Sequence, residues 1–383
     1  MRSFILLLIA VCVLSIKAER PRFTEHGFHF VDLFKDVPLR SQNQTRAKTP
    51  PKDDVLRFFI LGDFGQLENY FGIRTVGAMM DKMAANKSYD YITTVGDNFY
   101  KHGLEDITYR MKPFLITQQF QRENLRDLPI HVTLGNHDCH SNYLNEIYYS
   151  DYNKQWNLPT DYYELVTPMK DNPEVNFVNL MLNSCKLFCL DNPYVKTDIC
   201  DKMHVEIGSD EVLEHYAWLE DRLEYYSSLN TTAWLAVSLH HIPFKLDTFK
   251  MLLLPMLRKY NIDFIFTAHA HHAEYANMAP DYETRFPGED AKILKNCTDD
   301  TEIFVHTARE HTFKKNETLH QFMSGNGGHT LGTLCPFKDQ DGEVYFQSYN
   351  YYGVTSVEAT SKKVTVTFNR DFDDMVYRIN IEA

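Results

Sequence analysis

The sequence carries few positive charges for its size. Lysine and arginine together number 39 against 52 aspartates and glutamates, and the formal net charge is -13 at pH 7. Proteins that bind nucleic acids hold the phosphate backbone with clustered Lys and Arg, so this deficit disfavours a nucleic acid partner. A small phosphorylated substrate is not excluded, because a local cation attracts such a molecule more directly than surface charge does.

Long apolar runs are also scarce. The first, from Phe4 to Ile16, follows Met1-Arg2-Ser3 and is closed by the small residue Ala18. This pattern predicts a signal peptide over residues 1–18, because the run is shorter than the roughly 20 residues that span a bilayer; a membrane anchor is the alternative. No later apolar stretch reaches spanning length. We therefore expect no membrane span after signal cleavage, and a secreted or lysosomal/vacuolar protein.

Cysteine is infrequent, and its number suits an oxidising compartment. Of seven cysteines Cys12 leaves with the signal peptide, and an even number remains. Cys185 and Cys189 have no matching Cys or His pair for zinc, so we expect disulfides, with Cys189 or Cys185 bridged to Cys200. Glycosylation triplets, which support a secreted glycoprotein, begin at Asn43, Asn86, Asn230, Asn296 and Asn316.

Internal repeats and low-complexity tracts are absent from the sequence. After the signal peptide, the chain divides into an N-terminal extension and one domain. Residues 19–54 are mostly polar and contain Pro50-Pro51, which predicts a loose N-terminal extension, and residues 55–383 form the expected catalytic domain. Strands are expected over 55–61, 91–95, 131–134, 177–182 paired with 186–190, 234–239, 262–267 and within 343–367. Helices are expected over 73–85, 111–124, 211–226 and 248–260, the last kinked or split by Pro255. This mixture indicates a layered α/β domain.

Short polar motifs end the apolar runs. In order they are Gly62-Asp63-Phe64-Gly65, Gly96-Asp97-Asn98-Phe99-Tyr100, Gly135-Asn136-His137-Asp138, Val237-Ser238-Leu239-His240 and Ala268-His269-Ala270-His271. In α/β sheets, sites assemble beyond the carboxyl ends of the strands. The candidate metal ligands are Asp63, Asp97, Tyr100, Asn136, His240, His269 and His271, and His137 is left for substrate.

Each motif alone is weak evidence for a metal. Gly-Asp is a common turn pair, and a histidine at a strand end such as His240 is more often structural than a ligand. His269 and His271 are a stronger signal, because alternate residues of an extended segment share a face. All of the motifs in one chain, in this order, are a remote coincidence, so the set predicts a metal site.

The chemistry of the donor atoms limits which metal ions the site can bind. Carboxylate, phenolate, amide oxygen and imidazole suit iron, zinc or manganese. Asp97 could bridge two metals roughly 3.5 Å apart, which would polarise phosphoryl oxygens and lower the pKa of bound water to give hydroxide for in-line attack. An ionised Tyr100 would favour a trivalent ion, because a phenolate is a strong anionic donor.

These motifs and their order resemble the calcineurin-like metallophosphoesterase superfamily. Tyr100, three residues after Asp97, is similar to the pattern of the purple acid phosphatases, and further segments resemble their small, mammalian-type, tartrate-resistant members. Those segments are Trp156-Asn157-Leu158-Pro159 with Tyr162-Tyr163, Trp218-Leu219-Glu220, Ser324-Gly325-Asn326-Gly327-Gly328, and Ser356-Val357-Glu358 to Val366-Thr367. The resemblance covers about residues 55–370. The extension is too short for the added N-terminal β-sandwich of plant-type members.

The resemblance implies an α/β/β/α sandwich of two mixed sheets flanked by helices, in four layers. It implies a secreted or lysosomal acid phosphatase that hydrolyses phosphomonoesters by attack of a metal-bound hydroxide. The ferric ion would be bound by Asp63, Asp97, Tyr100 and His271, and a divalent Fe, Zn or Mn by Asp97, Asn136, His240 and His269. Charge transfer from Tyr100 would colour the protein purple, and His137 would contact the phosphate and help protonate the leaving alkoxide.

The chain departs from the family pattern at two places. Ala268 stands where a glycine is usual before the paired histidines, and no histidine lies between His241 and His269 to serve as a second proton donor. His241 and His272 adjoin predicted ligands. Each is a candidate for a catalytic role, and the alternative is a supporting or surface position.

Two other functions compete with the phosphatase. A catalytically weak or inactive scaffold could retain the fold, as glideosome-associated relatives in apicomplexan parasites do, but a scaffold is free to lose ligands and a membrane scaffold needs an anchor. Here every ligand position is filled and no C-terminal anchor is visible. A phosphodiesterase or nucleotide pyrophosphatase is disfavoured because such sites usually lack a counterpart of Tyr100. The expected partners are small phosphorylated substrates or phosphoproteins.

Overall fold

The computed structural model describes residues 53–107, 111–283, 293–294, 302–304, 308–331, 337–338, 341–349, 351–371 and 374–383. The signal peptide over 1–18 and almost all of the extension over 19–54 lie outside the described residues. So do Cys12, Cys297 and Cys335 and the triplets at Asn43 and Asn296. The expectations for these segments stay predictions.

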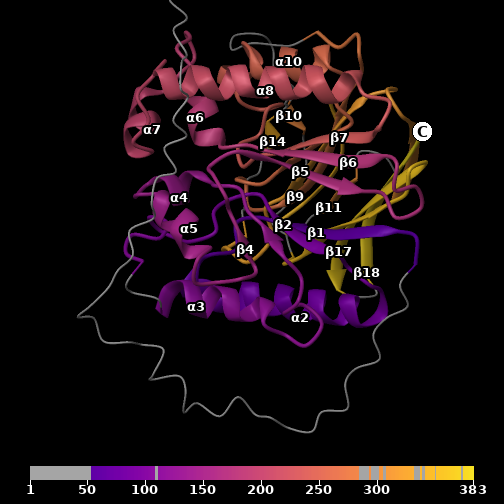
Figure 1. Ribbon diagram of the computed structural model, residues 1–383, viewed down its shortest axis with the longest axis horizontal. Helices are drawn as coiled ribbons and strands as arrows, with labels where there is room; N and C mark the ends of the chain where they lie inside the picture. Colours follow the sequence, from indigo (N-terminus) through magenta and orange to yellow (C-terminus); the bar gives the residue numbers. More distant parts are fainter. Residues whose placement is uncertain are drawn as a thin grey trace, which may run out of the picture. The chain divides into compact units, whose positions relative to one another are not determined.

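Two eight-stranded sheets form the middle of the domain (Figure 1). The first has the order β12 (Glu310–Lys314), β18 (Asp374–Glu382), β17 (Lys363–Asp371), β16 (Val354–Ala359), β1 (Leu56–Leu61), β2 (Tyr91–Thr94), β3 (Ile130–His131), β4 (Trp156–Asn157). The second has the order β11 (Glu302–Phe304), β15 (Glu343–Ser348), β9 (Ala273–Met278), β13 (Leu319–Ser324), β8 (Phe264–Thr267), β7 (Thr232–Ser238), β6 (Asn176–Met181), β5 (Tyr163–Pro168). Strands β10 (Ile293–Leu294) and β14 (Phe337–Lys338) pair separately.

Helices cover the outer faces of both sheets. Figure 1 shows α2 and α3 on one side of the stacked sheets, and α8 and α10 on the other. The helices are η1 (Leu67–Asn69), α2 (Tyr70–Asn86), α3 (Met111–Thr117), η2 (Gln118–Phe120), α4 (Asn136–Cys139), α5 (Leu144–Tyr149), α6 (Ser184–Phe188), α7 (Thr197–Lys202), α8 (Asp210–Ser228), α9 (Asp247–Lys250) and α10 (Leu253–Lys259). Both sheets mix parallel and antiparallel pairs, so the α/β/β/α sandwich of four layers is confirmed.

The sequence of β1 shows why this strand lies between two apolar layers. All of its residues are buried, and successive side chains point to opposite faces of a sheet. Phe58 and Ile60 belong to the core between the two sheets, whereas Phe59 and Leu61 pack with α2. The same strand pairs in parallel with β2 and antiparallel with β16, which places its carboxyl end beside that of β2.

One element differs in kind from the sequence prediction. Residues 186–190 do not form a strand, because α6 occupies most of that segment. The side chain of Asn183 accepts a hydrogen bond from the Cys185 backbone N–H at 3.1 Å, which caps the helix. The helix is buried on all sides, so its apolar run has the appearance of a core strand. Strand β6 instead pairs antiparallel with β5 and parallel with β7.

Other differences concern boundaries and strands that were not predicted, among them β5, β9, β12, β13 and β18. The expected helix over 248–260 is split into α9 and α10, with Pro255 in the first turn of α10, where a missing N–H removes no helical hydrogen bond. Strand β18 at the end of the chain was not predicted; it pairs with β17 over most of its length. No helix in the described part of the chain is long and apolar enough for a transmembrane segment.

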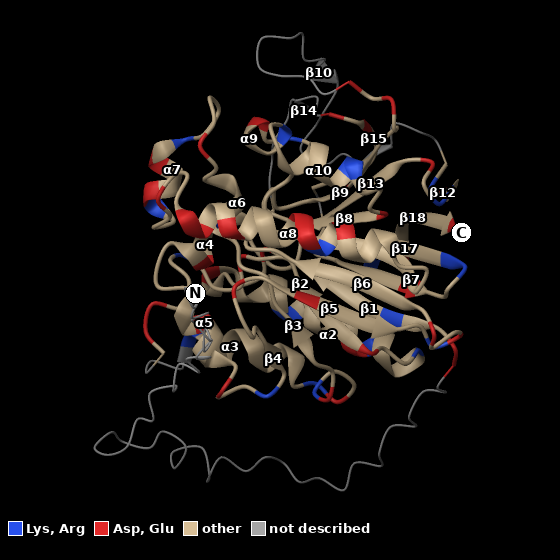
Figure 2. Ribbon diagram, turned by 45° about the horizontal axis from the view of Figure 1, so that its top comes forward, with Lys and Arg blue, Asp and Glu red and all other residues tan. Residues whose placement is uncertain are grey.

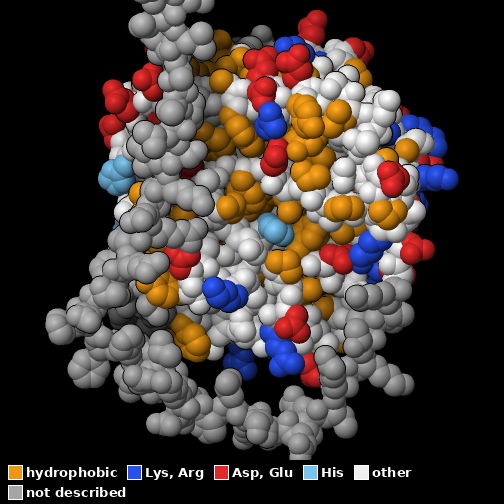
Figure 3. All heavy atoms as spheres, viewed as in Figure 1, with side chains coloured by type: hydrophobic (Ala, Val, Ile, Leu, Met, Phe, Trp, Pro, Cys, Tyr) orange, Lys and Arg blue, Asp and Glu red, His pale blue; other side chains and the backbone are white. Residues whose placement is uncertain are grey.

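Acidic residues gather on part of the surface. Figure 2 shows Asp and Glu positions along the ribbons of α7 and α8, and in Figure 3 acidic side chains gather at the top of the face on view. A negative surface does not draw phosphorylated molecules toward the protein. Any attraction for a phosphate group must therefore arise locally, from charges within a site.

A buried histidine makes stability depend on pH. His320 in β13 is 1% exposed, its Nδ1 lies 2.8 Å from the Tyr275 hydroxyl, and burial lowers its pKa to about 3. Between pH 6.5 and 3 the unfolded chain binds a proton that the folded chain does not. The free energy of unfolding therefore decreases as the pH is lowered, by up to about 1.4 kcal/mol per pH unit. We expect His320→Gln to lose less unfolding free energy than the wild type between pH 7 and 5. Urea unfolding at both pH values measures this, and equal losses would contradict a neutral buried imidazole.

Candidate metal centre

The predicted ligands come from turns at the carboxyl ends of strands in both sheets. Asp63 follows β1, Asp97 and Tyr100 follow β2, Asn136 begins α4 after β3, His240 follows β7, and His269 and His271 follow β8. The structure brings all of them together, with the contacts given below. Their metal binding remains a prediction.

The first donor group surrounds the Tyr100 hydroxyl. This oxygen lies 2.9 Å from Asp63 Oδ1, 2.7 Å from Asp97 Oδ2 and 3.3 Å from His271 Nε2. Ligand atoms of Asp63, Asp97 and His271 all lie within 4.8 Å of one another. These residues can therefore converge on a single ion.

The second donor group surrounds the Asn136 side-chain oxygen. Its Oδ1 lies 3.0 Å from His240 Nε2 and 2.9 Å from His269 Nδ1. His240 Nε2 is also 3.4 Å from Asp97 Oδ1. Asp97 thus presents Oδ2 to the first group and Oδ1 to the second, which is the arrangement of a bridging carboxylate.

The hydrogen-bond chemistry of the second group fits a cation. His240 Nδ1 donates to the Val95 carbonyl at 2.9 Å, so in the neutral ring Nε2 carries a lone pair. Burial opposes a charge on this ring, but the carboxylates of Asp97 and Asp63 raise the pKa of His240 to about 9. Nε2 therefore points a proton at the oxygens of Asn136 and Asp97, and a metal ion would take the place of that proton. A backbone carbonyl that orients the far side of an imidazole is also the usual support for a metal-binding histidine. The residues present therefore fit a metal ion.

The electrostatics of the first group point the same way. Burial raises the pKa of the Asp63 carboxyl well above its usual range. Burial also raises the pKa of the Tyr100 phenol, and the carboxylates of Asp63 and Asp97 raise it further. A multivalent cation that binds here must displace these protons, so metal affinity is linked to pH.

The backbone turns sharply at several of the ligands. Asp63, Asp97, His269 and His271 have φ values of 55°, 55°, 76° and 51°. A residue with a Cβ in this left-handed region costs roughly 1–2 kcal/mol. Such strain is typical of functional sites, where the surrounding structure holds the residue in place. Here the turns aim the side chains across the ends of the strands.

Ala268 fits the loop without distortion. Its φ lies outside the left-handed region, its side chain is fully buried, and its N–H donates to the His240 carbonyl at 3.1 Å. A Cβ placed on Gly62 would lie only 2.4 Å from the Ala268 Cβ. The glycine that makes room for the paired histidines is therefore Gly62, which follows β1 of the first sheet, opposite the loop after β8 of the second.

His241 and His272 are both buried, which excludes the surface position considered for them. The Nδ1 of His241 lies 2.8 Å from Ser184 Oγ, and its ring stacks on Phe188 while its centre lies 4.8 Å from that of His269. His272 Nε2 lies 3.1 Å from Glu274 Oε2, which also accepts from the Lys245 ammonium at 2.8 Å. Both histidines therefore support the loops behind the ligands.

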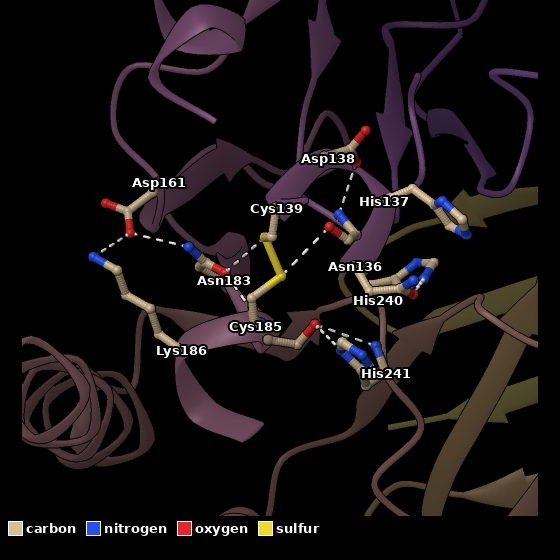
Figure 4. Close-up of a disulfide and its surroundings, with 12 residues drawn as sticks. Asn136, His137, Asp138, Cys139, Asp161, Asn183, Cys185, Lys186, His240 and His241 are labelled. Carbon is tan, nitrogen blue, oxygen red and sulfur yellow. Dashed lines mark hydrogen bonds and ion pairs between the residues drawn. A yellow bond between two sulfur atoms is a disulfide. The ribbon is translucent and has the colours of Figure 1, made fainter. Parts of the chain in front are cut away.

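A disulfide braces the ligand-bearing helix α4. Cys139 in α4 is bonded to Cys185 in α6. Figure 4 shows that this bond joins the helix that carries Asn136 and His137 to the helix that lies beside His241. A second bond joins Cys189 to Cys200, so a local bridge to Cys200 is confirmed with Cys189 as the partner. The Cys139–Cys185 bond spans 46 residues and had no signal in the sequence.

Two further imidazoles lie beside Tyr100. The His137 ring centre is 4.3 Å from that of Tyr100, and its backbone N–H donates to Asp97 Oδ1 at 2.9 Å. His329 was missed by sequence reasoning: its ring centre lies 4.4 Å from that of Tyr100 and 3.9 Å from that of His271. The sequence feature that could have identified His329 is its position directly after Ser324–Gly328, one of the segments that resemble the purple acid phosphatases.

Comparison with known proteins agrees with this geometry. The family model for calcineurin-like phosphoesterases matches residues 56–273, which include every predicted ligand, and the chain belongs to this family. Tartrate-resistant acid phosphatase type 5 of Sus scrofa is 33% identical over 134 residues, which are 34% of this chain and 39% of that enzyme. The alignment thus spans about two fifths of the pig protein.

Solved structures share the fold. GAP50, the anchor in the inner membrane complex of Plasmodium, has a TM-score of 0.60 at 15% identity, over 85% of this chain and 88% of that one. The purple acid phosphatase PPD1 from yellow lupin (Lupinus luteus) seeds has a TM-score of 0.52 at 15% identity, over 88% of this chain and 55% of that one. At these identities the likeness concerns the fold alone.

The contact between Gly62 and Ala268 can be tested with a double substitution. We expect Gly62→Ala to lower metal content and to cost about 1–3 kcal/mol of stability, because the new methyl group overlaps that of Ala268. Ala268→Gly alone should have a small effect. The double variant should recover part of the loss, since Val95 Cγ2 at 3.0 Å still crowds residue 62. Metal analysis and thermal unfolding measure both effects, and a double variant as defective as Gly62→Ala would rule out this contact as the cause.

Proposed function

We propose that this protein is an acid phosphatase that hydrolyses phosphomonoesters at a dinuclear centre of Fe(III) and a divalent Fe, Zn or Mn ion. The observation that carries the proposal is the Asp97 carboxylate, which faces one donor group with each of its oxygens. The family shown above supports hydrolysis of a phosphoester. The phenolic donor of Tyr100 favours a trivalent ion in the first group.

Each donor has a defined task in this proposal. Asp63, Tyr100 and His271 would hold the ferric ion, Asn136, His240 and His269 would hold the divalent ion, and Asp97 would bridge the two. When bound, the two ions supply Lewis acidity and a nucleophile at acidic pH.

His137 is placed to meet the substrate. Its Nδ1 lies 2.5 Å from the Lys101 carbonyl, and because a carbonyl only accepts, Nδ1 carries the hydrogen. Nε2 is then the ring atom left for the substrate, on a side chain that is only half-buried. In this position His137 would contact the phosphate, and with a proton on Nε2 as well as Nδ1 it would transfer the Nε2 proton to the leaving alkoxide.

The substrates would be small phosphorylated molecules or phosphoproteins, attracted by the centre rather than by the acidic surface. The disulfides at Cys139–Cys185 and Cys189–Cys200 support an oxidising compartment, consistent with secretion or a lysosomal/vacuolar location. A scaffold without activity is the alternative, since GAP50, an anchor protein, shares the fold. The assembled donor set favours the enzyme, because a scaffold has no need of it.

The activity can be tested with p-nitrophenyl phosphate from pH 4 to 8. We expect acid-favoured turnover by the purified protein, and Asp97→Asn should lose at least about a hundredfold in kcat and one metal ion, because both donor groups share this carboxylate. Asp127→Asn, at an exposed aspartate, is the matched control. Full activity in Asp97→Asn, or no turnover by metal-replete wild-type protein, would refute the phosphatase and favour the scaffold.

The identity of the first metal can be tested by colour. If Tyr100 binds Fe(III), the wild-type protein should be purple, and Tyr100→Phe should lose the visible absorption band while it keeps the ring packed against His137. An absorption spectrum and iron analysis on the same sample measure this. A colourless wild-type protein with full turnover would reject the ferric tyrosinate and leave the two-metal site intact.

A further inference from the structure

A histidine outside the proposed ligand set lies against the metal centre. The His329 ring centre is 3.9 Å from that of His271 and 4.4 Å from that of Tyr100, and its side chain is only half-buried. It lies beyond residues 56–273, the segment that the family model matches. The match to the family model therefore does not include this residue.

The loop that carries His329 is fixed to the turn of Asp63. The His329 backbone N–H donates to the Asp63 carbonyl at 2.6 Å. Gly327 N–H donates to the Gly62 carbonyl at 3.2 Å, and a Cβ on Gly327 would lie 2.4 Å from that oxygen, so only glycine allows this approach. The loop thus follows the ligand-bearing turn closely.

Residues after Asp63 hold the loop from the other side. The Asn69 side chain donates to the Gly328 carbonyl at 3.0 Å, and the Gln66 side-chain oxygen accepts from the Thr330 N–H at 2.9 Å. His329 therefore lies between two anchored neighbours. A residue held in this way keeps its position when a substrate binds, which lowers the entropy cost of a contact.

The orientation of the ring leaves one nitrogen for a partner. His329 Nδ1 lies 3.0 Å from the Thr330 carbonyl, which only accepts, so Nδ1 donates and Nε2 points elsewhere. His137 has the same arrangement, with Nδ1 bound to the Lys101 carbonyl. Both rings lie within 4.4 Å of the Tyr100 ring centre. Two half-buried imidazoles with similar orientation thus border the same donor group.

We propose that His329 is a second substrate-binding histidine, whose Nε2 lone pair accepts a hydrogen bond from the O–H of the singly protonated phosphate group of the bound ester, beside His137. The inference rests on the proposed phosphatase function.

The test compares the metal-loaded wild-type protein with His329→Ala and His329→Gln. Inorganic phosphate is the probe, and its binding is measured by calorimetry and by inhibition of p-nitrophenyl phosphate hydrolysis. We expect His329→Ala to weaken phosphate binding and raise KM by roughly tenfold or more, the effect of one hydrogen bond to a charged group. Metal content and the visible absorption band should not change, and His329→Gln should recover part of the affinity.

His311→Gln is the matched control, because His311 lies in β12 at the edge of the first sheet, outside the proposed site. Unchanged phosphate binding in His329→Ala overturns the proposal. Loss of metal or a shifted absorption band in that variant also overturns it, since His329 would then support the ligands instead of the substrate.

The two proposals can fail separately. Wild-type protein that binds phosphate but does not hydrolyse the ester would reject the phosphatase, and weaker phosphate binding in His329→Ala would still support the contact. Wild-type protein that is loaded with metal and binds no phosphate would overturn both.

Discussion

The two oxygens of the Asp97 carboxylate are the contact on which the metal centre depends. One faces Tyr100 and the other faces His240, so neither donor group is complete without this side chain. Asp97 follows β2 of the first sheet and His240 follows β7 of the second, so the carboxylate also connects the ends of the two sheets. Its position is further held by the His137 N–H, which donates to Oδ1.

The packing around this carboxylate maintains a costly arrangement. The left-handed backbone at Asp63, Asp97, His269 and His271 is strained, and buried carboxyl groups are expensive unless they are hydrogen-bonded. The neighbouring Asp138 shows how the site meets this cost, since its carboxylate accepts hydrogen bonds from three backbone N–H groups, at Asn98, Phe99 and Gly135. Burial of the apolar layers on either side of each sheet offsets the unfavourable free energy of the strained backbone and buried carboxyl groups in the site.

Much of the site could be predicted from the sequence because its signals are local. An apolar run followed by a polar turn places Asp63 or Asp97 at a strand end without knowledge of the rest of the chain. Pairings between distant segments carry no such signal: the Cys139–Cys185 bond and the contact of His329 with Tyr100 depend on the folded topology. Helix α6 was mistaken for a strand because burial on every side erases the periodicity that distinguishes the two. The direction of each Asp97 oxygen likewise emerges only from the assembled turns.

The origin of the donors in both sheets has a consequence for how the protein folds. A chain that has formed only the first sheet holds Asp63, Asp97 and Tyr100 but lacks the imidazoles that follow β7 and β8. If these residues bind metal as proposed, high-affinity uptake must wait until the two sheets pack together. The absorption of a tyrosinate–metal bond would then report on that late step. Refolding kinetics followed at this wavelength would measure the rate at which the two sheets pack together, separately from the rate at which each sheet forms.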